Sequence, residues 1–296
     1  MWKKGLLFGL VCTTSLGINA QYKSSYTVSN NQDFDKVKFS LNATNGQCYI
    51  EASPDAGIMD IQSKTDSDSK PQYKENIVNR TKEVNVKMDE EQSSSLSTSI
   101  SRRLFSSQSV DDYTWKVYLS KLKPMDLDLN YAVGDTYIDL SDIPIERLKM
   151  RTGTANVRIN YKKGMGNRLM MDTFLIKVDM GSLEAKNLHL SNSKNIIANV
   201  GFGNVKMDFE DAEILTTEVQ ATVGAGSLEI LLPEGDIPVR ININDSPLCR
   251  IKIPVGFEQT SEHVFVSSGY KDHQTNYINF SVDVAVGNIH FRSSNH

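Results

Sequence analysis

The sequence predicts an all-β protein: a β-solenoid-like stack of two-strand repeats with terminal capping strands, with a β-sandwich as the alternative. Three observations lead to this prediction. Short runs of alternating apolar and polar residues recur along the chain, as expected of strands with one buried face. A glycine opens each of the clearest runs, and these glycines recur about every 20 residues, enough for two short strands and two turns. Such repetition indicates a stack in which each unit covers its neighbours.

The clearest repeat is Gly203–Phe209, in which Val205, Met207 and Phe209 are expected to face inward. A glycine tolerates the positive φ that a turn requires, and it lets neighbouring backbones approach closely. We therefore assign a structural role to the glycines that head these repeats. They are Gly134, Gly153, Gly181, Gly203, Gly226 and Gly287, with a weaker copy at Gly46.

The composition indicates a thin core and a large solvated surface. Hydrophobic residues make up 39% of the 296 residues, below the usual share of a globular protein, and the mean hydropathy is -0.35. The net charge is -4, and lysine and arginine form no stripe along the sequence. Nucleic acid is therefore not an expected partner.

Residues 1–20 are predicted to be a signal peptide. Lys3 and Lys4 precede an apolar stretch that ends at Cys12, and small and polar residues follow up to Ala20. The stretch is too short to span a bilayer, and no later segment is apolar enough to do so. We therefore expect an exported protein in the periplasm, on the outer surface or outside the cell. A lipid anchor at Cys12 is disfavoured, because Val11 stands where a small residue is expected.

The rest of the chain divides into three segments. Residues 21–112 are expected to form an N-terminal β segment with a polar, serine-rich and partly disordered loop at 64–110, in which Glu83–Met88 alternates like a strand. Residues 113–235 hold the glycine-headed repeats. Residues 236–296 are expected to be a C-terminal β cap continuous with the repeats, since their prolines suit edges and strand ends.

Two cysteines follow the predicted signal peptide, Cys48 and Cys249. An oxidising compartment would permit a disulfide between them. The alternation favours a different interpretation, in which both are small buried hydrophobes, because each lies on the apolar side of its run.

Three segments resemble a known family: Val200–Phe209, Val223–Pro233 and Val286–Phe291. They are similar to the bacterial toast-rack and "putative adhesin" repeat domains, including the extracytoplasmic part of LiaF-type cell-wall-stress regulators. The resemblance spans about residues 110–291 and rests on glycine followed by alternation. It implies a β-solenoid-like stack at the cell envelope, with no established enzyme activity and no catalytic residues to carry over. LiaF-type regulators usually have transmembrane helices, which this chain lacks after its N-terminal segment.

No catalytic residue, cofactor or metal site is predicted. Gly201-Phe202-Gly203 and Gly224-Ala225-Gly226 lack the third glycine and the following helix of a nucleotide-binding loop. The Asp126–Asn130 segment lacks the glycine and the final glutamate of a calcium loop. The histidines show no zinc-ligand spacing.

The outward positions of the repeats are the remaining candidates for function. Stacked acids could bind cations or sugars, or hydrolyse glycosides if two converge. Tyr137 and Tyr161 are the expected outward aromatics, too few to assert a sugar-binding stripe. The outward charged residues are Asp139, Glu184, Asp208 and Glu229, with Lys206, Arg158 and His290 among them.

Three functions are consistent with the sequence. The favoured hypothesis is a non-catalytic, adhesin-like interaction protein whose partner is an unidentified envelope protein or glycan. The second is an envelope-stress regulator that binds a membrane sensor. The third, a remote one, is a carbohydrate-active enzyme.

Overall fold

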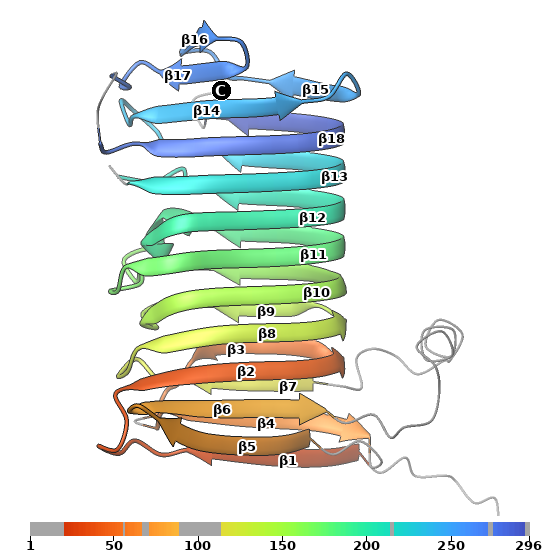
Figure 1. Cartoon of the computed structure of the whole chain (residues 1–296), viewed down its shortest axis with the longest axis vertical. Helices are drawn as coiled ribbons and strands as arrows, with labels where there is room; N and C mark the ends of the chain where they lie inside the picture. The colour runs from red at the N-terminus through yellow and green to blue at the C-terminus, as the bar shows by residue number, and fades with distance from the viewer. Residues whose placement is uncertain are drawn as a thin grey trace, which may run out of the picture.

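The computed structural model describes residues 21–55, 57–66, 71–88, 114–213, 216–271 and 275–293. Within them the chain forms β-strands and one short 3-10 helix, η2 (Leu188–Ser191). The strands stack into a two-sided solenoid (Figure 1). The predicted all-β, solenoid-like class is confirmed.

The centre of the solenoid consists of long strands that each bend once and so contribute to both sides. We call each turn of the chain around both sides a rung. In Figure 1 these strands cross the front, bend at the right and continue behind. They pair in parallel, β10 with β11, β11 with β12, β12 with β13, and β13 with β18. The bounds are β10 Ile145–Asn160, β11 Met171–Lys186, β12 Ser193–Asp208, β13 Thr217–Leu231 and β18 Ile278–Arg292.

Toward both ends of the stack, a pair of shorter strands makes each rung, and two rungs are out of sequence order. The β2/β3 rung lies between β6/β7 and β8/β9. The last strand, β18, lies between β13 and the β14/β15 rung, inside the segment expected to be a cap. The bounds are β2 Lys36–Asn45, β3 Gln47–Ala52, β6 Thr81–Met88, β7 Thr114–Leu119, β8 Met125–Val133, β9 Thr136–Asp139, β14 Val239–Asp245 and β15 Cys249–Lys252.

Antiparallel strands flank the stack at both ends. β1 (Gln21–Val28) pairs with β4 (Met59–Asp66), which pairs with β7, while β5 (Pro71–Val78) pairs with β6. At the other end, β17 (Val264–Ser267) pairs with β14 and with β16 (Phe257–Ser261). Pro71 opens β5, where a missing N–H is tolerated.

Part of the 64–110 segment, expected to be mostly loop, is therefore strand. Val84 and Val86 of β6 are fully buried and pair with Phe39 and Leu41 of β2. The strand-like alternation of Glu83–Met88 thus lies within β6, and β5 pairs with β6 to complete a hairpin. Residues 67–70 and 89–113 lie outside the described residues, as do residues 1–20 with the predicted signal peptide and Cys12.

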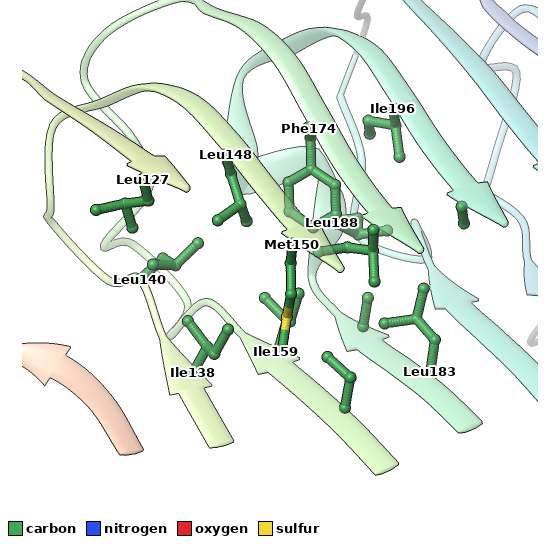
Figure 2. Close-up of a cluster of buried hydrophobic side chains, with 14 of the residues drawn as sticks. Leu127, Ile138, Leu140, Leu148, Met150, Ile159, Phe174, Leu183, Leu188 and Ile196 are labelled. Atoms are coloured by element: carbon green, nitrogen blue, oxygen red, sulfur yellow. The ribbon is translucent and has the colours of Figure 1, made fainter. Parts of the chain in front are cut away.

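The core lies between the two sides. Corresponding inward residues form columns along the stack: Leu127, Leu148, Phe174 and Ile196 are successive neighbours on one side. Figure 2 shows them facing Ile138, Ile159 and Leu183 of the other side. Every one of these side chains is at most 2% exposed. Burial of each contributes about 1.5 to 3 kcal/mol, so repeated rungs together offset the entropy of ordering.

A column of small residues marks the bend of each rung. Gly181, Gly203, Gly226 and Gly287 are successive partners, each with φ between 130° and 145°. A Cβ on Gly203 would lie 1.6 Å from the carbonyl oxygen of Gly181, so the bend requires glycine there.

Gly153, counted among the glycines that head the repeats, stands outside this column. Ala155 is the partner of Gly181, and Gly153 lies two residues earlier with no positive φ. It belongs to a second column of close contacts, because a Cβ on it would lie 2.6 Å from the carbonyl oxygen of Ala132. Gly201 and Gly224 make equivalent contacts.

The two cysteines are far apart in the stack. Cys48 is buried in β3, near the N-terminal end, and Cys249 is partly buried in β15, near the C-terminal end. Figure 1 shows β3 and β15 at opposite ends of the stack, with the central rungs between them. The structure therefore has thiols here, and not the disulfide that an oxidising compartment would have permitted. Burial raises the pKa of the Cys48 thiol to about 12.

Candidate functional site

Two ladders of outward side chains run along the solenoid on the side formed by the second halves of the rungs. The first ladder passes through Lys116, Tyr49, Tyr137 and Arg158 to Glu184, one residue per rung. After Glu184, the first ladder continues through Lys206, Glu229, His290 and Lys252. The second ladder lies two residues further along the same strands and contains Tyr118, Glu51, Asp139, Asn160 and Lys186.

The predicted outward residues thus fall into two ladders. Glu184, Glu229, Lys206, Arg158 and His290 share the first ladder. Asp139 and Asp208 occupy positions of the second. Most of these acids have a basic partner: Asp139 with Lys162 at 2.8 Å, Glu184 with Lys186 at 3.5 Å, and Glu229 with Lys206 at 3.5 Å and Arg292 at 3.4 Å.

The two ladders form the walls of a cavity of about 870 Å³, which we call the axial groove. It extends across β7, β3, β9, β10 and β11 and opens on the outer face. Ile50, Ile138 and Ile159 line it but are at most 2% exposed, because their side chains point into the core. The floor is therefore strand backbone, and the walls are polar and aromatic side chains.

Aromatic stacking organises one wall of the axial groove. The rings of Tyr49 and Tyr137 lie parallel, with centroids 5.1 Å apart and planes at 8°. The guanidinium of Arg158, one rung further, lies 5.0 Å from the Tyr137 ring centroid. Both faces of Tyr137 are thus covered, one by a ring and one by a cation, an arrangement favoured by cation–π attraction. The Tyr49 hydroxyl donates a hydrogen bond to Gln47 Oε1 at 2.7 Å.

The opposite wall contains a carboxyl group that is held in its charged form. Burial alone would raise the pKa of Asp139, but hydrogen bonds from Lys162 and Ser141 outweigh it and lower the pKa below its usual value. A carboxyl group with a lowered pKa is ionised at neutral pH, so it can accept hydrogen bonds but has no proton to donate. The chemistry of this wall therefore favours holding a ligand over protonating one.

Tyr161, expected to be outward, is fully buried. The alternation that places Val157 and Ile159 inward extends to it, so the sequence contained the correct signal. Sequence reasoning also missed Tyr49 as a member of the groove. It is the partner of Tyr137 only because the β2/β3 rung lies directly beside β8/β9.

The Gly-X-Gly segments form corners. Gly201-Phe202-Gly203 and Gly224-Ala225-Gly226 lie at the bends of β12 and β13, with strand before and after. Their middle residues line up with Met180 and Val286 along the outer edge, where Phe202 is 63% exposed. These corners serve to turn the chain.

The Asp126–Asn130 segment is part of β8. Asp126 pairs with Lys36 at 2.9 Å, and Asp128 accepts a hydrogen bond from Asn130 Nδ2 at 2.9 Å. Across the described ranges, no group of three His, Cys, Asp or Glu residues is placed to hold a metal ion. No helix within those ranges has the length and apolar character needed to cross a membrane.

The fold and its surface define a parallel two-sided β-solenoid with side-chain ladders on its outer faces. The chain belongs to the toast-rack N-terminal domain family (DUF2154), whose model matches residues 18–174, more than half of the chain. The match begins well before the segments in which the resemblance was found, and it ends within β11.

The solved structures that match this chain include three bacterial proteins. A "putative cell adhesion protein" from Clostridium sporogenes is 17% identical with a TM-score of 0.45, covering 93% of this chain and all of that one. A "putative adhesin" from Bacteroides fragilis is 10% identical with a TM-score of 0.26, covering 93% and 98%. A "putative lipid binding protein" from Parabacteroides distasonis is 10% identical with a TM-score of 0.30, covering 91% and 96%. Such distant similarity supports no conclusion about function. A comparison with curated proteins gave no match.

Proposed function

We propose that this chain is a non-catalytic interaction protein of the bacterial cell envelope, exported by its N-terminal segment, and that the axial groove is its binding surface. The observation that supports the proposal is the groove itself. It is a cavity of about 870 Å³ on an outer face whose side chains are fixed in ladders by the strand register. Membership of the toast-rack family agrees with an envelope protein.

The electrostatics of the groove favour binding over catalysis. A glycosidase needs a carboxylic acid that can donate a proton, and such groups have raised pKa values. Asp139 instead has a lowered pKa and a lysine partner at 2.8 Å.

The experiment compares two arginines of the same strand. Arg158 lies in the groove, whereas Arg147 is exposed on the outer face of the other side. The full chain, Arg158→Ala and Arg147→Ala are immobilised, and the amounts of each envelope component that they retain are measured. We expect the wild type and Arg147→Ala to retain the same component, and Arg158→Ala to retain at least about tenfold less. Equal retention by all three forms would refute the proposal.

A further inference from the structure

We infer that the axial groove binds a neutral, hydroxyl-rich polysaccharide chain that lies along the solenoid axis. This inference rests on the proposed function, because it names the ligand class of that same groove. It follows from the direction of the groove, the balance of charge on its walls, and the pairing of the strands that form its floor.

The groove runs across strands, not along them. Its first wall extends from Lys116 on β7 to Glu184 on β11, which are four strand spacings apart. At about 4.8 Å per spacing the wall is about 19 Å long. Its ligand is therefore an extended chain, long enough to present several units in succession to successive rungs.

The walls carry basic and acidic side chains in equal number. The basic side chains that line the groove are Lys116, Arg158 and Lys186, and the acidic ones are Glu51, Asp139 and Glu184. A polyanion would approach three carboxylates, and a polycation three basic groups. A neutral ligand is repelled neither by the carboxylates nor by the basic groups. Its hydroxyl groups both donate and accept hydrogen bonds, so they can use the donors and the acceptors of both walls.

The floor gives an extended peptide no strand edge to join. β3 is paired on both edges, with β7 and β9, and β9 is paired with β3 and β10. Recognition by strand addition requires an unpaired edge. The apolar floor residues Ile50, Ile138 and Ile159 face the core, so they offer no pockets for apolar peptide side chains. A ligand can therefore be recognised only by the side chains of the walls, and the hydroxyl groups of a sugar can exchange hydrogen bonds with them.

The Arg158 side chain is ordered before a ligand binds. It lies over the Tyr137 ring, which in turn stacks on Tyr49, so its side chain is held in place before binding. It makes no ion pair within the described part of the chain, which leaves its N–H groups available to the groove. An ordered side chain loses less conformational entropy on binding.

The test titrates the full chain with neutral oligosaccharides long enough to span the groove: cello-, laminari- and malto-oligosaccharides. Oligogalacturonate provides an acidic probe and deacetylated chito-oligosaccharide a basic one. Binding is followed by calorimetry and by shifts of backbone amide resonances. We expect at least one neutral oligosaccharide to bind, with an affinity that hardly changes between ~0.05 M and ~0.5 M salt.

Variants locate the binding. Tyr137→Ala and Arg158→Ala should each weaken it at least about tenfold, whereas Arg147→Ala, on the other side of β10, should not. Thermal unfolding of each variant checks that the fold is intact. Failure of every neutral probe to bind, or binding of only a charged probe in a salt-dependent way, would overturn the inference. The proposed function would survive that result if envelope components were still retained through Arg158.

Discussion

Ala155 of β10 and Gly181 of β11 are direct partners at the bend of successive rungs, yet only Gly181 has a positive φ, 130°. A Cβ on Gly181 would lie 1.9 Å from the carbonyl oxygen of Ala155. The methyl group of Ala155 itself is accommodated and only 4% exposed. The bend therefore accommodates a side chain on the β10 rung, although the rungs on either side have a glycine with positive φ there, Gly134 at 135° and Gly181 at 130°.

Gly203→Ala is expected to destabilise the chain severely. The new Cβ would lie 1.6 Å from the carbonyl oxygen of Gly181, at a backbone φ of 143° that a side chain rarely adopts. Overpacking and strain together should lower the free energy of unfolding by about 3 kcal/mol or more. Gly164→Ala is the control, since Gly164 has a φ of 77° but open space around it, and should cost about 1 to 2 kcal/mol. Denaturant unfolding distinguishes them, and equal losses would refute the close contact.

The glycine pattern showed that corners exist but not which glycine stands at the bend. Two corners have the form small residue, outward residue, small residue: Gly153-Thr154-Ala155 and Gly201-Phe202-Gly203. Either end of such a triplet can be glycine, because both approach the neighbouring backbone. Only the strand register shows that Ala155 and Gly203 are equivalent and that Gly153 is not.

Met207→Asp is expected to unfold the central rungs. Met207 is fully buried between the two sides of β12, and a carboxylate there would have neither water nor a partner charge. The free energy of unfolding should fall by more than about 4 kcal/mol. Lys206→Ala, at the adjacent outward position, should change it by no more than about 0.5 kcal/mol. Circular dichroism in denaturant measures both. Comparable stability of the two variants would mean that the inward register is misassigned.

Alternation identified the inward side of most strands but not their neighbours. Val205, Met207 and Phe209 are buried as the sequence predicts. The insertion of β18 between β13 and the β14/β15 rung left no trace in the sequence, because alternation decides which face is buried and every rung offers a similar apolar face. The groove depends on the same long-range order, since Tyr49 and Tyr137 meet only where β3 pairs with β9.

Tyr161→Phe is expected to leave stability unchanged or raise it by up to about 1 kcal/mol. The Tyr161 hydroxyl is buried and has no hydrogen-bond partner among the described residues, and burial raises the pKa of the phenol. Removing a buried polar group without a partner removes its desolvation cost. Tyr137→Phe, on the outer face, should change stability by less than about 0.5 kcal/mol. A clear loss of thermal stability in Tyr161→Phe alone would indicate a hydrogen bond to that hydroxyl.

His189 lies in η2, in the connection between β11 and β12. Its Nδ1 is buried without a hydrogen-bond partner among the described residues. Burial lowers the pKa of His189, and Lys163 lowers it further, while Asp208, Asp211 and Glu213 act in the opposite direction. Burial prevails, so the folded chain disfavours the protonated imidazole.

This lowered pKa predicts a pH dependence of stability. A histidine with a lower pKa in the folded than in the unfolded chain stabilises the fold when neutral. That stability is fully present above the unfolded pKa of about 6.5 and is lost as the pH falls toward the folded pKa. We expect the free energy of unfolding to decrease between about pH 7 and pH 5, and His189→Gln to flatten this decrease. The contribution of Asp139 is separate, because its lowered pKa places its loss of stability below about pH 4. Unfolding curves at several pH values measure both slopes, and an unchanged slope in His189→Gln would show that the burial of His189 does not produce the dependence.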